Sequence, residues 1–231
     1  MRILAMDTAT SACSVALWQD GDITHHRFEA MMRGQAEALA PMIADVLKSA
    51  NVESEELDLL AVTVGPGAFT GLRIGLATAR GMALAANIPC LGLTTTEVLA
   101  HAIGEDQFPN GSLLVALDSK RSDIYVQAFA LNRAPAGDAE AIEPANLGQW
   151  LQDIPGPVHV VGDAATLAVA ALKETSIEAH APEANDVPDA TVIAALAAAR
   201  WSPDAPPPTP SPLYIRPPDA KLPRNGGRLR P

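Results

Sequence analysis

Two aspartates end the apolar strands that we expect near the start and the middle of the chain. Asp7 follows the run from Arg2 to Met6, and Asp118 follows the run from Ser112 to Leu117. Carboxylates at strand ends in α/β sheets often meet ligands, so Asp7 could hold a magnesium–phosphate group. The simpler interpretation is that Asp7 accepts hydrogen bonds from backbone N–H groups of the turn at Thr8 to Thr10.

A glycine-rich turn links the strand expected at Leu59 to Val64 with a helix expected at Thr70 to Ala86. Such a turn can direct backbone N–H groups at a phosphate bound at the start of a helix. Its glycines at 65, 67 and 71 are spaced G-x-G-x-x-x-G, one residue longer than the dinucleotide-binding pattern, and no G-K-[ST] follows. The spacing therefore favours a structural turn that lets the helix pack closely, and it leaves a phosphate cradle as the alternative.

The helix at 70–86 is built mostly from small residues, and its three glycines each cost roughly 1 kcal/mol relative to alanine. Its large residues lie around much of the circumference, so it must be buried on most sides, inside its own domain or against another chain. The helix expected at 35–50 also carries more apolar residues than one stripe needs. We predict a protein–protein interface formed by Leu39, Met42, Ile43, Val46, Gly71, Leu72, Ile74, Gly75, Thr78, Ala79 and Met82.

No established catalytic or metal-binding motif occurs in the sequence. There is no HExxH and no G-x-S-x-G elbow, and Cys13 and Cys90 form no CxxC or Cys/His spacing. Among the five histidines, His25 and His26 are adjacent on an expected strand and so face opposite sides. We therefore predict no catalytic residue and no metal ligand in this chain.

The composition is that of an acidic globular protein. Acidic residues outnumber basic ones 27 to 16, giving a formal net charge of -11, which disfavours general binding to nucleic acid or anionic lipid. No charge-free apolar run approaches the ~20 residues of a membrane span. Asp7 also interrupts the apolar core that a signal peptide would need. We expect a cytoplasmic protein that does not enter a membrane.

The order of expected elements repeats along the chain. An apolar strand, an aspartate, a polar turn and a second strand occur near residue 7 and again near residue 118. Three strands followed by helix–strand–helix–strand is the pattern of the paired ribonuclease-H-like fold of actin, Hsp70 and sugar kinases (ASKHA). We predict an α/β protein with two such halves, at 1–105 and 106–220, and a flexible basic tail at 221–231.

In this fold the loop after the strand expected at Val158 to Val161 often binds adenosine. Gly162 and Asp163 therefore join Asp7 as candidates for a vestigial nucleotide site. No phosphate-binding residues in the sequence support that site.

The last 31 residues hold 10 of the 20 prolines and five of the basic residues. The prolines forbid a helix and favour extended chain. Leu213-Tyr214-Ile215 is the one apolar cluster in this segment, and we expect it to dock on the body, with the end beyond about Lys221 mobile. The basic end is interpreted as a solubilising tail, or alternatively as an arm that contacts phosphate.

Five segments of the chain resemble successive blocks of one protein family. They are ILAMDTATSACSVAL, VGPGAFTGLRIGLATARGMA, ALDSKRSDIY, VGDAA and PLYIRPPDA, spread from Ile3 to about Ala220. In this order they are similar to the TsaB family, also called YeaZ. One departure is the stretch from Arg33 to Glu37, which lacks the histidine of the R-x-H-S-E-like stretch often present in members.

The resemblance implies a bacterial, non-catalytic subunit that supports synthesis of N6-threonylcarbamoyladenosine (t6A) on tRNA. The catalytic paralogue TsaD holds the metal and transfers the threonylcarbamoyl group, and the ATPase TsaE completes the complex. The helices at 35–50 and 70–86 would serve both homodimers and the heterodimer with TsaD. This chain alone would bind no cofactor, would use no ATP or metal of its own, and would meet tRNA through the complex.

Two other functions compete with this expectation. An ATP-using enzyme of the same fold would need Asp7 to work with a phosphate-binding loop, and an M22-type metallopeptidase would need a metal site. The sequence leaves open whether the isolated chain is a monomer or a homodimer. It also leaves open whether a nucleotide binds at the junction with TsaD, and whether the basic tail contacts tRNA.

Overall fold

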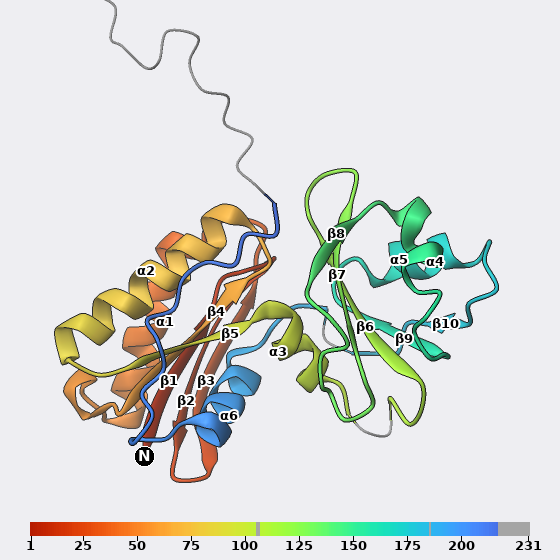
Figure 1. Cartoon of the computed structure of the whole chain (residues 1–231). Helices are drawn as coiled ribbons and strands as arrows, with labels where there is room; N and C mark the ends of the chain where they lie inside the picture. The colour runs from red at the N-terminus through yellow and green to blue at the C-terminus, as the bar shows by residue number, and fades with distance from the viewer. Residues whose placement is uncertain (105–106, 185, 217–231) are drawn as a thin grey trace, which may run out of the picture.

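Two sheets with helices on their faces lie side by side in the computed structural model (Figure 1). The structure describes residues 1–104, 107–184 and 186–216. Among these residues, no helix has both the length and the apolar character required to cross a bilayer.

The first sheet has the strand order β3-β2-β1-β4-β5. β1 pairs with β2 in antiparallel fashion, and a tight turn at Asp20 and Gly21, both at positive φ, joins β2 to its antiparallel neighbour β3. β4 lies parallel to β1 on the other side because a helix separates the two in sequence. The strands are Arg2–Asp7 (β1), Ala12–Gln19 (β2), Asp22–Ala30 (β3), Leu59–Gly65 (β4) and Cys90–Thr94 (β5).

The second sheet repeats the first, with the order β10-β9-β6-β7-β8. β6 takes the place of β1, being antiparallel to β7 and parallel to β9. The strands are Ser112–Asp118 (β6), Ile124–Phe129 (β7), Glu140–Ile142 (β8), Val158–Val161 (β9) and Ala179–His180 (β10). The same order and the same strand directions confirm the predicted duplicated ribonuclease-H-like fold.

The helices cover both faces of each sheet. Side chains alternate along β1, so Leu4 and Met6 face α1 and α2, whereas Ile3 and Ala5 face α6. α3 and α6 lie between the two sheets (Figure 1). The helices are Gln35–Ala50 (α1), Phe69–Ala86 (α2), Thr95–Ala102 (α3), Leu147–Trp150 (α4), Ala165–Leu172 (α5) and Ala190–Arg200 (α6), with 3₁₀ turns at Ser54–Glu56 (η1) and Pro144–Asn146 (η2).

α6 follows the second half in sequence but packs on the first sheet. Its buried face, which includes Ile193 and Ala197, meets Ile3 and Ala5. Its start is fixed there by a 3.0 Å hydrogen bond from the Ala190 N–H to Ser14 Oγ. The two halves are therefore tied together by a helix as well as by the connection after α3.

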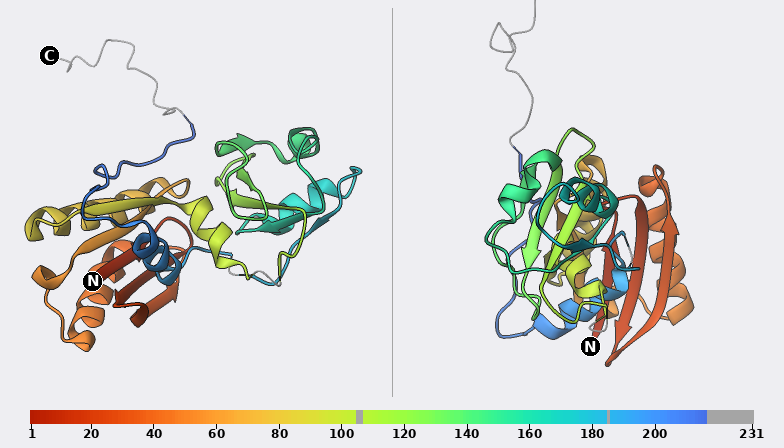
Figure 2. Two further views of the ribbon diagram at one scale, coloured as in Figure 1. Left: turned by 60° about the horizontal axis from the view of Figure 1, so that its bottom comes forward. Right: turned by 90° about the vertical axis from the view of Figure 1, so that its right-hand side faces the viewer.

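The chain after α6 also returns over the first half, and Figure 2 shows this segment (blue) passing above α2. The Leu213 N–H donates a 2.7 Å hydrogen bond to the Val64 carbonyl oxygen, which confirms the expected docking of the cluster at 213–215. The expected mobile end and the tail at 221–231 lie outside the described residues. The domain limits drawn from the sequence stay predictions.

Candidate functional site

The glycine-rich turn lies directly on the turn between β1 and β2. The Ala68 N–H donates to the Ala9 carbonyl at 2.7 Å, and Thr8 Oγ1 donates to the Gly71 carbonyl at 2.7 Å. A Cβ atom on Gly67 would come within 2.4 Å of the Ala9 oxygen, and one on Gly71 within 2.1 Å of the Thr8 oxygen. These glycines therefore serve close backbone packing, which supports the structural interpretation of the turn over a phosphate cradle.

Asp7 lies beneath these two turns and has no exposed surface. Asp7 Oδ1 accepts two hydrogen bonds, one from Thr63 Oγ1 at 2.5 Å and one from the Ala9 N–H at 3.1 Å. Asp7 Oδ2 is buried without a hydrogen-bond partner in the described part of the chain. Burial raises the pKa of Asp7 to about 7, against the lowering effect of the Thr63 hydrogen bond. In this conformation the carboxyl caps the turn and cannot reach a hydrated metal–phosphate group.

This burial gives a pH-dependent stability that can be measured. Because the pKa of Asp7 is higher in the folded chain than its ordinary 3.8, the folded state binds more protons between pH 3.8 and about 7. The neutral carboxyl contributes its full stabilisation below that window. As pH rises through the window, the free energy of unfolding falls by up to about 4 kcal/mol. Asp7→Asn should therefore gain stability relative to wild type as pH rises, measured by urea unfolding at a series of pH values.

The control for this prediction is Asp118→Asn at the equivalent strand end, where hydrogen bonds from Lys120 outweigh burial and lower the pKa. That variant should lose stability relative to wild type as pH rises through the range of the carboxyl. An Asp7→Asn difference that stays flat with pH would contradict a neutral buried carboxyl.

Gly162 and Asp163 hold the loop after β9 against β6. Gly162 has φ +102°, and a Cβ there would lie 2.3 Å from the Ala116 carbonyl oxygen. Asp163 Oδ1 accepts a 2.8 Å hydrogen bond from the Asp118 N–H, and burial raises its pKa. Lys120 Nζ lies 2.7 Å from Asp118 Oδ2. The contacts of both candidate residues are thus structural.

A cavity of about 370 Å³ opens between the two halves. Asp118, Lys120 and Asp163 line one wall, and the β1–β2 turn and the start of α1 line the other. Asp7 does not line it, because the glycine-rich turn separates the carboxyl from this space. The three residues of the predicted vestigial nucleotide site are therefore not brought together.

The predicted interface residues divide by depth on α1 and α2. The side chains at 39, 43, 46, 72 and 79 are at most 6% exposed and pack on the sheet, and Gly71 and Gly75 are also buried. These residues anchor the helices within the chain, and the interface itself stays a prediction. Those that reach the surface in part are Met42, Ile74, Thr78 and Met82.

Exposed apolar residues extend this surface beyond the predicted set. Met32, just before α1, is 74% exposed, and Leu84 on α2 is 84% exposed. Gly81 is exposed on α2, and in the part of the chain that the structure describes a Cβ there would meet nothing within 4 Å. We call this set, with the four partly exposed residues above, the α1–α2 surface. The sequence could have indicated these exposed residues, because they are apolar or small residues outside the apolar stripe that faces the core.

Within the described residues, no group of three or more His, Cys, Asp or Glu side chains is arranged to hold a metal ion. The buried thiols of Cys13 and Cys90 have their pKa values raised by burial, to about 12 and about 11.

Residues 29–189 match the family model described as "TsaD: tRNA N6-adenosine threonylcarbamoyltransferase". The chain is 41% identical over 168 residues to the Escherichia coli (strain K12) "tRNA threonylcarbamoyladenosine biosynthesis protein TsaB", covering 70% of this chain and 71% of that protein. The chain belongs to the TsaB family.

Two further comparisons extend over nearly the whole chain. An uncharacterized protein of Mycobacterium tuberculosis (H37Rv) is 31% identical over 222 residues, covering 95% of this chain and 93% of that protein. The solved structure of YeaZ from Pseudomonas aeruginosa superposes with a TM-score of 0.76 at 26% identity, covering 92% of this chain and 99% of the other. The resemblance to the TsaB family, also called YeaZ, is thereby confirmed.

Proposed function

We propose that this chain is a non-catalytic subunit of the machinery that makes t6A in tRNA, and that it binds a TsaD-type catalytic partner. The observation that carries the proposal is the 41% identity to a protein named for threonylcarbamoyladenosine biosynthesis. The family model that matches residues 29–189 is named for the transferase. A non-catalytic chain that shares its fold with a catalytic one is suited to pair with it.

The geometry around Asp7 supports a non-catalytic role. The carboxyl has no exposed surface, and the glycines nearest to it are used for packing against Thr8 and Ala9. An ATP-using enzyme of this fold would need that carboxyl to reach the nucleotide. Chemistry, with its ATP and its metal, would then belong to the TsaD and TsaE partners.

The α1–α2 surface supports the pairing. Met32 and Leu84 are exposed, and Met42, Ile74 and Met82 are partly exposed. Burying apolar surface of this kind against a partner would stabilise the complex. Methionine side chains are flexible, so they can pack against different partners. The same surface would serve a homodimer in the absence of TsaD. The protein would act in the cytoplasm and meet tRNA within the complex.

An omission experiment tests this function. The tagged chain is copurified with its cognate TsaD, and threonylcarbamoyl transfer to tRNA is assayed with TsaD, TsaE and either this chain or buffer. We expect a stable complex and loss of product to background when this chain is omitted. Transfer by this chain alone, or failure to associate with TsaD, would overturn the proposal.

Two binding measurements address the rival functions directly. Micromolar ATP binding by the isolated chain would favour an ATP-using enzyme, and stoichiometric zinc or iron in the purified protein would favour a metallopeptidase. We expect neither. In the reconstituted complex, Asp7→Asn should retain the transfer rate of wild type, because the buried carboxyl meets no substrate.

A further inference from the structure

The segment at 210–216 crosses from the first half of the chain to the second. It passes β5 and the end of β4, runs beside the start of α2 and reaches the β6–β7 turn. Together with the glycine-rich turn and the β6–β7 turn, it walls a cavity of about 860 Å³. We call residues 210–216 the strap, because they contact both halves.

The backbone of the strap is anchored on the first sheet. Pro210 is buried against β5, where a Cβ on Gly92 would lie 2.9 Å from the Pro210 Cβ. Three residues later, the Leu213 N–H donates a 2.7 Å hydrogen bond to the Val64 carbonyl oxygen at the end of β4. These two contacts fix the path of the strap over the first half.

Tyr214 adds side-chain contacts between the strap and α2. Its ring stacks on that of Phe69, with centroids 5.5 Å apart and an interplanar angle of 30°. Arg73 donates a 3.0 Å hydrogen bond to Tyr214 Oη, and its guanidinium lies 3.7 Å from the Phe69 ring centroid. Backbone, apolar and aromatic contacts thus hold this end of the strap on the first half.

The strap meets the second half through an ion pair whose carboxylate is buried. The Arg216 guanidinium pairs with Asp123 at the β6–β7 turn, and the Asp123 side chain is only 8% exposed. Ser119 Oγ donates a 2.5 Å hydrogen bond to Asp123 Oδ1, which gives the carboxylate a fixed position. A buried carboxylate is costly without a charged partner. The pair therefore favours the arrangement in which the strap lies against the second half.

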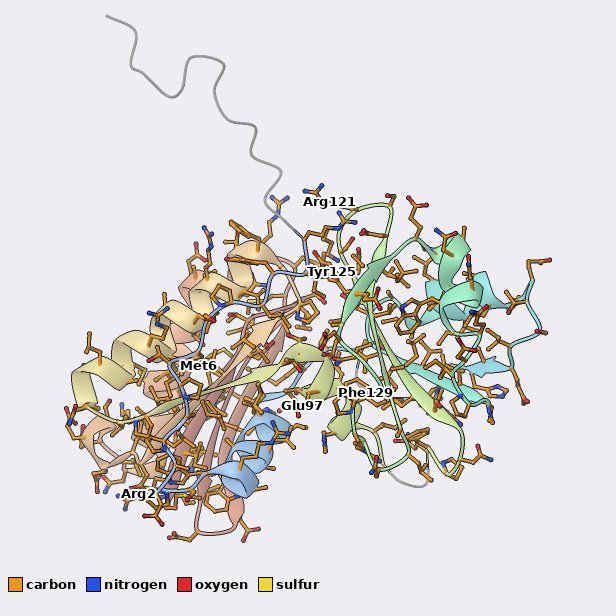
Figure 3. All side chains as sticks on the ribbon, viewed as in Figure 1. Arg2, Met6, Glu97, Arg121, Tyr125 and Phe129 are labelled. Atoms are coloured by element: carbon orange, nitrogen blue, oxygen red, sulfur yellow. The ribbon has the colours of Figure 1, made fainter. Side chains whose placement is uncertain are left out.

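The two halves also meet at α3, at a different place. α3 lies between the sheets, with Val98 in a core cluster of the first half and Leu99 in one of the second. Figure 3 labels Glu97 of α3 between the halves. It labels Arg121 and Tyr125, which flank the ion-pair partner of the strap in sequence, nearer the end where the strap crosses. Two separate connections restrict rotation of one half against the other more than α3 alone would.

We propose that the strap holds the two halves in one relative orientation and that the Arg216–Asp123 pair is its releasable end. Domains joined by a small interface are expected to move relative to one another unless something restrains them. When the pair opens, the second half turns about α3 and the cavity under the strap changes shape. A partner that contacts both halves meets a surface of fixed shape only while the strap is closed. The inference does not rest on the proposed function.

The test measures the separation of the halves by single-molecule fluorescence energy transfer in the full-length chain. Ser49→Cys on α1 and Ala170→Cys on α5 provide exposed attachment points for the two dyes. Cys13 and Cys90 are buried, so they are protected from labelling. Picomolar concentrations keep the chain monomeric, so that each signal reports one molecule. We expect a single narrow distribution of transfer efficiency for the chain with its strap intact.

Two variants release the strap, and a third is the matched control. Arg216→Ala removes the partner of a buried carboxylate and should raise the fraction of molecules with altered separation about tenfold. Asp123→Asn removes the other charge and should shift the distribution in the same direction. Arg27→Ala breaks an ion pair with Asp45 that lies within the first half, so the distribution should stay narrow.

Equal distributions for Arg216→Ala and Arg27→Ala would overturn the inference, as would a broad distribution with the strap intact. Thermal unfolding of the labelled variants separates release of the strap from loss of the fold. If Asp123→Asn unfolds, the comparison of Arg216→Ala with Arg27→Ala decides the question. Arg216→Lys keeps the positive charge, and it should restore most of the narrow distribution.

Discussion

Gly81→Arg is expected to abolish copurification with the TsaD-type partner and to reduce threonylcarbamoyl transfer to the level seen without this chain. Gly81 is exposed on α2, and no atom of the described residues lies within 4 Å of the position of a Cβ, so arginine can be accommodated in the monomer. A glycine in the middle of a helix costs about 1 kcal/mol relative to alanine. Since no contact among the described residues requires a glycine at 81, close approach of a partner helix would account for it.

The interface prediction has a matched control on the other half of the chain. Leu167 on α5 is also exposed, and Leu167→Arg should leave both pairing and transfer unchanged. Circular dichroism and unfolding curves should match wild type for both variants. If Gly81→Arg still copurifies with the partner and supports transfer, the α1–α2 surface is not the pairing surface.

Gly75→Arg, which the sequence alone would also suggest as an interface variant, does not test pairing. A Cβ on Gly75 would lie 2.8 Å from Thr8 Oγ1 and 3.3 Å from Val62 Cγ2. The arginine would therefore clash inside the first half and unfold it. Thr78→Arg remains informative because Thr78 is only partly buried.

Most of the secondary structure could be predicted because hydrophobic periodicity is a local property. The bounds of β9 and α1 match the prediction. β8 and β10 were missed because strands of three and two residues carry no recognisable period. The duplication could be predicted because Asp7 and Asp118 each follow an apolar strand and precede a polar turn.

The depth of the interface residues could not be read from the sequence. Leu39 and Met42 are both apolar residues of α1, yet the first is 1% exposed and the second is only partly buried. Periodicity indicates that a helix has an apolar stripe, but a wide stripe does not reveal which edge a sheet covers. The return of α6 to the first sheet was hidden for a related reason, since sequence order placed it with the second half.

The cavity of about 860 Å³ where the start of α2, the β6–β7 turn and the segment at 213–216 meet could not be predicted, because its parts are far apart in sequence. Phe69, Lys120 and Tyr214 come from three segments, and each is an ordinary residue in its own context. Only folding brings the start of α2 beside the β6–β7 turn. The docking of Leu213 on Val64 then places the second ring beside the first.

Gly71→Ala is expected to destabilise the isolated chain by about 3 kcal/mol, near the upper end of what overpacking usually costs. The added Cβ would lie 2.1 Å from the Thr8 carbonyl oxygen, so the backbone of either α2 or the β1–β2 turn must move. That movement also threatens the 2.7 Å hydrogen bond from Thr8 Oγ1 to the Gly71 carbonyl. In thermal unfolding the midpoint should fall by roughly 6–12 °C for a chain of this size.

A glycine-to-alanine substitution near the other end of α2 should have the opposite effect on the stability of the isolated chain. Gly81→Ala adds a methyl group in open space and improves helix propensity, so the isolated chain should gain up to about 1 kcal/mol. Urea unfolding of both variants at low protein concentration measures the pair without contributions from association. The two changes in the free energy of unfolding need not be equal in size. If both had the same sign, the two glycines would have the same role. Opposite signs would show that Gly71 serves the fold of this chain, and they would leave the glycine at 81 to be explained by a partner.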